Sequence, residues 1–133
     1  MVKGFVLGLA LVAGLASGVA AQTVPTEMAK LGGQKITLYV YPFLTENELT
    51  TLRLVQHNKQ ALAVFVPGTE GFAALAIAPN EGFLRDGSPV PSAVALSGLP
   101  DATSAAVAVL KGCDAARKGG EPCVIVLEIG PGK

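Results

Sequence analysis

Few side chains in this sequence have the type and spacing that catalysis requires. His57 is the single histidine, and neither a nucleophile nor an orienting acid is placed beside it. A histidine that acts as a base needs both of these partners. Glu46 and Glu48 could be considered as an acid–base pair, but residues two apart on a helix point to different sides. We therefore expect no catalytic residue, no cofactor, no metal site and no enzymatic activity.

The two cysteines, Cys113 and Cys123, are the residues with a clear covalent role. An even pair in an exported chain favours a disulfide. It would close a loop of about 11 residues and contribute roughly 3 kcal/mol. Free thiols and a redox-active pair are the alternatives, although redox motifs place their thiols two residues apart. Two cysteines and one histidine are too few for a four-ligand zinc site. We predict a structural disulfide.

Residues 1–21 have the layout of a secretory signal peptide. Lys3 gives a positive start, residues 4–16 are apolar, and small residues precede a cleavage site before Gln22. The apolar stretch is short for a membrane span, and an uncleaved anchor is the alternative. We expect a bacterial chain that is periplasmic or secreted, with no membrane attachment after the signal is cleaved.

Composition and length limit the classes of partner and the number of domains. The chain has ten Lys and Arg against ten Asp and Glu, a formal net charge of zero. A near-neutral chain without a basic cluster does not favour nucleic-acid binding. Residues 22–34 lack periodicity and are expected to form a flexible lead-in. Residues 35–133 are long enough for a single domain with a small core.

The hydrophobic pattern of residues 35–133 predicts both strands and helices. A capping box formed by Thr45 and Glu48 starts the first helix. The expected strands are 36–41, 61–66, 72–78, 92–96 and 123–129, and the expected helices are 46–58 and 102–118. This order predicts an α+β fold, a small two-layer sandwich with one disulfide and an antiparallel or mixed sheet. The split βαβ (ferredoxin-like) arrangement is the candidate topology. Alternate alanines in 72–78 would let a helix pack closely on that strand.

Residues 79–91 form the most distinctive connection in the chain. Gly, Pro and Asp-Gly interrupt periodic structure there, and a short strand is expected at 82–85. The two prolines near its end would stiffen the segment and lower the entropy lost on docking. A solvated connector is the alternative. We interpret the segment as a partner-contact loop with these candidate residues: Glu81, Arg85, Asp86, Ser88, Pro89 and Pro91.

Three hypotheses for function follow from these features. The first is a small exported module that binds an unknown protein or envelope component without catalysing a reaction. The second is a small periplasmic inhibitor that presents residues 87–92 to a hydrolase. The third is a small-ligand-binding protein, which would need a concave pocket with converging polar groups.

Three segments of the C-terminal half occur in a recognisable combination. Residues 76–83 form a strand and turn, residues 101–113 an Ala-rich helix that ends in Cys, and residues 122–126 a strand that begins Pro-Cys-Val-Ile-Val. In this combination the chain resembles a group of small exported bacterial domains of unknown function. The resemblance leaves residues 22–66 uncovered, and it implies an exported, disulfide-linked module without an assigned reaction.

Some short exported bacterial chains with a similar ending look like those labelled aminolevulinate synthases. Such an enzyme needs a large fold around pyridoxal phosphate and a lysine placed for a Schiff base. A mature chain of this length, with no lysine in that context, does not supply them. We regard such a label as a misassignment.

Overall fold

The structure, a computed structural model, describes residues 24–66 and 71–132. The expected signal peptide, residues 1–21, lies outside the described residues. The helices and strands, in chain order, are β1 (Thr26–Leu31), β2 (Gln34–Tyr39), α2 (Glu46–His57), α3 (Lys59–Phe65), β3 (Phe72–Ile77), β4 (Leu84–Arg85), β5 (Ser88–Pro89), β6 (Val94–Leu99), α4 (Ala102–Ala116) and β7 (Val124–Pro131). None of the described helices is both long and apolar enough to cross a bilayer.

Five strands form one sheet in the order β1-β2-β7-β3-β6, and every neighbouring pair is antiparallel. β2 and β3 therefore run parallel to each other with β7 between them. β6 and β7 likewise run parallel with β3 between them. Each helical connection thus joins two strands that are separated by a third, which is a split βαβ arrangement. The predicted α+β class is confirmed.

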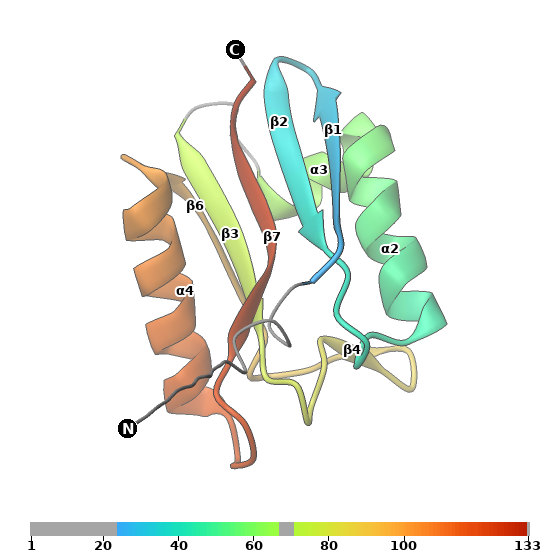
Figure 1. Cartoon of the computed structure of the whole chain (residues 1–133), viewed down its shortest axis with the longest axis vertical. Helices are drawn as coiled ribbons and strands as arrows, with labels where there is room; N and C mark the ends of the chain where they lie inside the picture. The colour runs from blue at the N-terminus through green and yellow to red at the C-terminus, as the bar shows by residue number, and fades with distance from the viewer. Residues whose placement is uncertain (1–23, 67–70, 133) are drawn as a thin grey trace, which may run out of the picture.

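Helices cover both faces of the sheet (Figure 1). On the α2 and α3 face, large apolar side chains form the main core, with Ile36, Leu38 and Leu127 fully or almost fully buried. On the other face, the alternate alanines of β3 pack against α4 at Ala105 and Val109, as their small size predicts. The structure thus adds a second helical layer to the two-layer sandwich expected from the sequence.

The expected strand at 61–66 is wrong, because residues 61–65 belong to α3 and Val66 is its C-cap. The Asn58 side chain caps this helix by accepting a hydrogen bond from the Ala61 N–H at 2.9 Å. Leu62 is 5 % exposed whereas Val64 is 78 % exposed, so the segment buries one helical face rather than two strand faces. A short apolar run fits both elements, and the cap three residues earlier decides between them.

The expected flexible lead-in at 22–34 contains an ordered edge strand, β1, which is a second correction. Gly32 and Gly33 both have positive φ, 59° and 80°, and they form the two-residue turn that pairs β1 with β2. The Gln56 amide donates to the carbonyl oxygens of Glu27 and Ile36 at 2.9 and 3.2 Å. These bonds join α2 to both strands of the hairpin.

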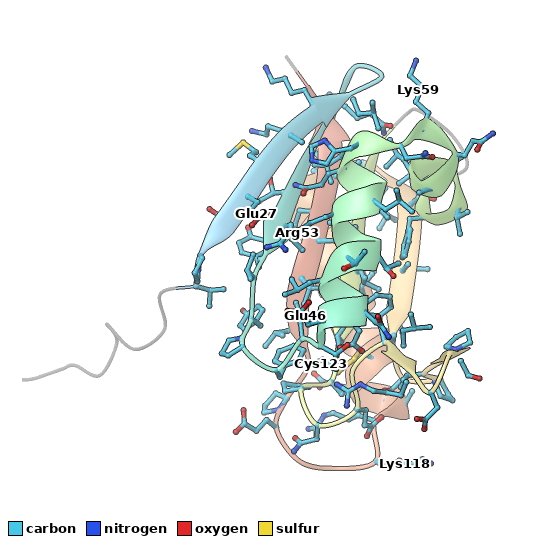
Figure 2. The ribbon with its side chains drawn as sticks, turned by 90° about the vertical axis from the view of Figure 1, so that its right-hand side faces the viewer. Glu27, Glu46, Arg53, Lys59, Lys118 and Cys123 are labelled. Carbon is cyan, nitrogen blue, oxygen red and sulfur yellow. A yellow bond between two sulfur atoms is a disulfide. The ribbon has the colours of Figure 1, made fainter. Side chains whose placement is uncertain are left out.

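An ion pair on the molecular surface also connects β1 to α2 (Figure 2). The Arg53 guanidinium donates two hydrogen bonds to the Glu27 carboxylate, at 3.0 and 2.8 Å. The Arg53 guanidinium holds the pKa of Glu27 below its usual range. Both side chains are more than two-fifths exposed, so the pair orients the strand but contributes little to the free energy of unfolding.

Candidate functional site

The structure does not assemble the catalytic candidates of the sequence into one site. His57 lies exposed at the C-terminal end of α2, whereas Glu46 and Glu48 lie at its beginning. Glu46 points into solvent and Glu48 is fully buried, so the two carboxylates do not face each other. Across residues 24–66 and 71–132, no cluster of three His, Cys, Asp or Glu side chains has the arrangement of a metal site.

The predicted disulfide between Cys113 and Cys123 is confirmed, with Cα atoms 6.1 Å apart. Both residues are buried, and the bond joins the buried face of α4 to the segment that enters β7. Asp114 accepts hydrogen bonds from the Cys123 N–H at 2.9 Å and the Arg117 guanidinium at 2.8 Å. The same two bonds hold the pKa of Asp114 below its usual value. The turn between α4 and β7 is therefore fixed both covalently and by hydrogen bonds.

Glu48 binds the base of the 79–91 loop from the first turn of α2. One carboxylate oxygen, Oε1, accepts from the Thr45 N–H at 3.0 Å and completes the predicted capping box. The other, Oε2, accepts from the backbone N–H groups of Phe83 and Leu84 at 2.9 and 3.0 Å, and from Arg85 Nε at 3.1 Å. One buried carboxylate thus accepts hydrogen bonds from N–H groups at the start of α2 and in the loop.

The electrostatic state of Glu48 follows from these donors. Burial by itself raises the pKa of this carboxyl. The N–H groups of Leu84 and Thr45, the Arg85 guanidinium and the Phe83 N–H together outweigh burial and hold the pKa below its ordinary value. The Glu48 side chain is fully buried while the Arg85 side chain is 39 % exposed, so the loop carries its cation at the protein surface.

Gly82 allows the loop to pass this close to Glu48. Its φ is +75°, a conformation that residues with a Cβ rarely adopt. A Cβ atom at this position would collide with the Arg85 guanidinium and with Glu48 Oε2. The ion pair and the loop backbone therefore fit together only with glycine here.

Glu81 connects the opposite side of the loop to the end of α4. Its carboxylate accepts hydrogen bonds from the Ser92 hydroxyl and, at 2.7 Å, from the Lys118 N–H. These two bonds hold the pKa of Glu81 below its usual value. Ser92 is 1 % exposed, so the end of the loop is buried as well as hydrogen-bonded.

The tip of the loop is a short hairpin exposed to solvent. β4 and β5 pair through Leu84 with Pro89 and Arg85 with Ser88. Asp86 and Gly87 form the turn with φ values of 54° and 76°, the geometry of a type I′ hairpin turn. We define the hairpin tip by its exposed residues: Asp86, Gly87, Ser88, Pro89 and Pro91.

The six candidate residues of the loop therefore fall into two groups. Glu81 and Arg85 make contacts within the molecule and fix the loop at its base. The remaining four, Asp86, Ser88, Pro89 and Pro91, are exposed. Sequence reasoning assigned Glu48 only a capping role and did not include Gly82 in the site. It placed Ser92 in the surface segment 87–92, whereas the structure buries this residue. A signal for Glu48 was present, because it shares a helical face with Leu52 and Val55, which are buried.

No family model, curated protein or solved structure matches the chain. The resemblance to exported bacterial domains of unknown function, stated above, stays a prediction.

Proposed function

We propose that this chain is a non-enzymatic, exported binding module that presents its hairpin tip to a protein partner or envelope component. The observation that carries the proposal is the contrast between the tip and its base. The tip is exposed, whereas the base is bound to α2 through Glu48 and to the segment just after α4 through Glu81. Exposed loops on a rigid scaffold are frequent binding surfaces.

A fixed base favours binding because less conformational entropy is lost when a partner orders the loop. Pro89 and Pro91 restrict φ on one side of the tip. The type I′ turn at Asp86 and Gly87 restricts the other side. Asp86 also places a carboxylate beside the turn, which favours a partner surface with a complementary positive charge.

The compartment in this proposal is the periplasm or the extracellular space. The Cys113–Cys123 disulfide supports it, because such bonds persist mainly in oxidising environments. Residues 1–21 have the layout of a signal peptide and agree with the same compartment.

Site-specific crosslinking in the native host tests the contact surface. A photoreactive residue replaces Ser88 at the tip in one variant and Val107, 59 % exposed on α4, in a matched control. We expect a discrete adduct at Ser88 that the control does not form, and we expect Pro89→Ala with Pro91→Ala to weaken it. Equal crosslinking at both positions would contradict the proposed surface.

Two further outcomes would separate the hypotheses. If the crosslinked partner is a hydrolase whose activity the purified protein lowers, the module acts as an inhibitor through the tip. If the purified protein converts a substrate, and changing one polar residue abolishes the conversion, the non-enzymatic proposal is wrong.

A further inference from the structure

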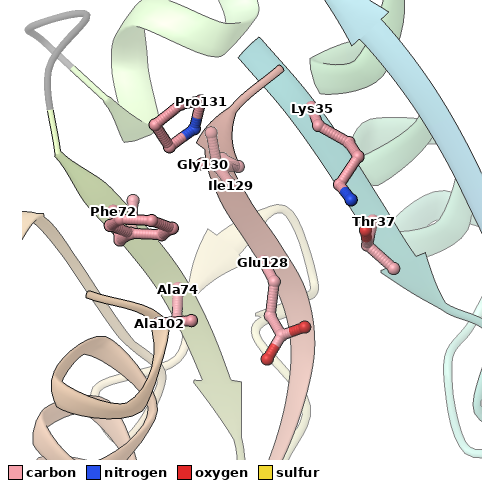
Figure 3. Close-up of a pocket in the computed structure, with 10 residues that line it drawn as sticks. Lys35, Thr37, Phe72, Ala74, Ala102, Glu128, Ile129, Gly130 and Pro131 are labelled. Atoms are coloured by element: carbon pink, nitrogen blue, oxygen red, sulfur yellow. The ribbon is translucent and has the colours of Figure 1, made fainter. Parts of the chain in front are cut away.

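A cavity of about 260 Å³ opens on the sheet face that carries α4 (Figure 3). α4 packs on β3, β6 and β7, and it leaves the β2 side of this face uncovered. Lys35 and Thr37 of β2 form one wall, Phe72 of β3 forms the opposite wall, and Glu128 and Gly130 of β7 lie between them. Such a volume suits a ligand about the size of one amino acid, since drug-sized ligands occupy larger pockets.

The shape of the cavity depends on Gly130. A Cβ atom here would lie 2.8 Å from two carbons of the Phe72 ring, which is closer than real contacts allow. Because this position has no side chain, the aromatic ring can lie over the β7 backbone beside an open floor. The cavity therefore has an apolar end at Phe72 and a polar end at Lys35, Thr37 and Glu128.

Two opposite charges line this small cavity without pairing to each other. Across β2 and β7, Lys35 is the register partner of Gly130, and Thr37 is the register partner of Glu128. Lys35 and Glu128 therefore lie diagonally to each other on the two strands. Neither forms an ion pair with any part of the chain that the structure describes. Glu128 instead accepts a hydrogen bond from the Tyr39 hydroxyl through Oε1 at 2.6 Å.

The Tyr39 hydrogen bond keeps Glu128 in place. Hydrogen bonding to Glu128 and burial raise the pKa of Tyr39 to about 12, so the phenol remains a donor at neutral pH. On the other side, the register partner of Lys35 in β1 is Lys30, and a like charge there does not neutralise it. The cavity thus offers a separated positive and negative charge.

We propose that this cavity binds a neutral, apolar α-amino acid. The Lys35 ammonium would bind the ligand carboxylate, Glu128 would bind the ligand ammonium, and the apolar side chain would lie against Phe72. A simple anion would be repelled by Glu128, and a simple cation by Lys35. A zwitterion satisfies both charges, and the apolar end of the cavity selects an apolar side chain.

This inference is independent of the proposed function. The cavity lies near the C-terminal end of β7, whereas the hairpin tip lies near the opposite end of the sheet (Figure 1). No residue of the tip lines the cavity. If no ligand binds the cavity, the proposed role of the hairpin tip is unaffected. If the tip forms no crosslink, the proposed ligand site is likewise unaffected.

Titration of the oxidised protein, expressed as the full chain with its leader and recovered after processing, tests the proposal by amide NMR. The three probes are L-leucine, 3-methylbutylamine, which lacks the carboxylate, and 4-methylpentanoate, which lacks the ammonium. We expect L-leucine to shift the Gly130 amide with a Kd of about 1 mM. Each analogue should bind about tenfold more weakly, because one charge-assisted contact is lost.

Variants assign each charge to its ligand group. Lys35→Gln should weaken L-leucine about tenfold and should not weaken 3-methylbutylamine, because the Lys35 ammonium repels this cation. Glu128→Gln, which can still accept from Tyr39, should weaken L-leucine and should not weaken 4-methylpentanoate, because the Glu128 carboxylate repels this anion. Lys111→Gln, an exposed lysine on α4 that does not line the cavity, is the matched control and should not change any affinity. No saturable shift at Gly130, or equal shifts from all three probes, would overturn the proposal.

Discussion

Replacing Glu48 by Gln removes the charge that joins α2 to the base of the hairpin loop while preserving the shape of the side chain. The native carboxylate accepts from three backbone N–H groups and pairs with Arg85. The amide keeps one acceptor oxygen and turns a donor group toward the remaining N–H groups. A hydrogen bond to a charged group is worth about 1.5–3 kcal/mol, and at least two would be lost or weakened. We expect a loss of about 3 kcal/mol in the free energy of unfolding, which is large against a total of about 5–15 kcal/mol.

The same substitution should change how stability depends on pH. The pKa of Glu48 in the folded protein lies below its ordinary value of 4.5. A depressed carboxyl pKa contributes stability that is fully present above the unfolded pKa and is lost as pH falls through the folded value. The native protein should therefore lose stability below about pH 4.5 more steeply than Glu48→Gln does. The difference between the two should be largest at neutral pH.

Urea denaturation at several pH values measures both effects, and amide hydrogen exchange locates them. Exchange at Phe83 and Leu84 should accelerate most, because these N–H groups lose their acceptor. Glu46→Gln, an exposed carboxylate in the same helical turn, is the matched control and should cost only about 0.5 kcal/mol through the helix dipole. If Glu48→Gln costs no more than this control, and exchange at Phe83 and Leu84 is unchanged, the proposed role of Glu48 is refuted.

Three other expectations can be tested with the same protein. Thiol labelling should give no adduct until the Cys113–Cys123 bond is reduced, and reduction should lower the unfolding free energy by about 3 kcal/mol; labelling of the native protein would contradict this. Gly82→Ala should cost more in urea denaturation than Gly87→Ala, because both have positive φ but only Gly82 lacks space for a Cβ. In an absorbance titration, the Tyr39 phenol should ionise only near pH 12, and Tyr39→Phe should remove that step.

Local signals in the sequence predicted most of the fold correctly. The capping box at Thr45 and Glu48 started α2 at the expected residue, and the helical spacing of apolar residues after Asp101 predicted α4. These features depend on residues within one or two helical turns of each other, so they can be recognised in a single sequence. The disulfide was also predictable, because Cys113 lies in α4 and Cys123 lies directly before β7, the next element along the chain.

The errors concerned a segment that needs a partner strand and an apolar run that fits both a strand and a helix. β1 has mixed polar and apolar residues and becomes a strand because it pairs with β2, although the Gly32-Gly33 turn was a readable hairpin signal. The 61–66 run has the composition of a strand, and its helical state depends on the cap and on burying one face only.

The candidate site was predictable only in its outline. Turn residues marked the 79–91 loop, but the contact of Glu48 with Phe83 spans 35 positions and follows from tertiary packing. The cavity beside Lys35 and Glu128 was beyond prediction for a similar reason. The cavity exists because β2 pairs with β7, and the sequence alone did not reveal that these two strands are neighbours.

A buried carboxylate such as Glu48 is weak evidence for stability by itself, since a well-packed apolar side chain often stabilises a protein equally well. An apolar side chain, however, could not bind the N–H groups of Phe83 and Leu84 in a fixed direction. The carboxylate therefore fixes the base of the hairpin loop against the first turn of α2, and Glu81 fixes it to the Lys118 backbone just after α4. If the tip is a binding surface, Glu48→Gln should lower crosslinking at Ser88 under conditions where the rest of the protein remains folded. Loss of the adduct only upon global unfolding would mean that Glu48 serves stability and not the geometry of the tip.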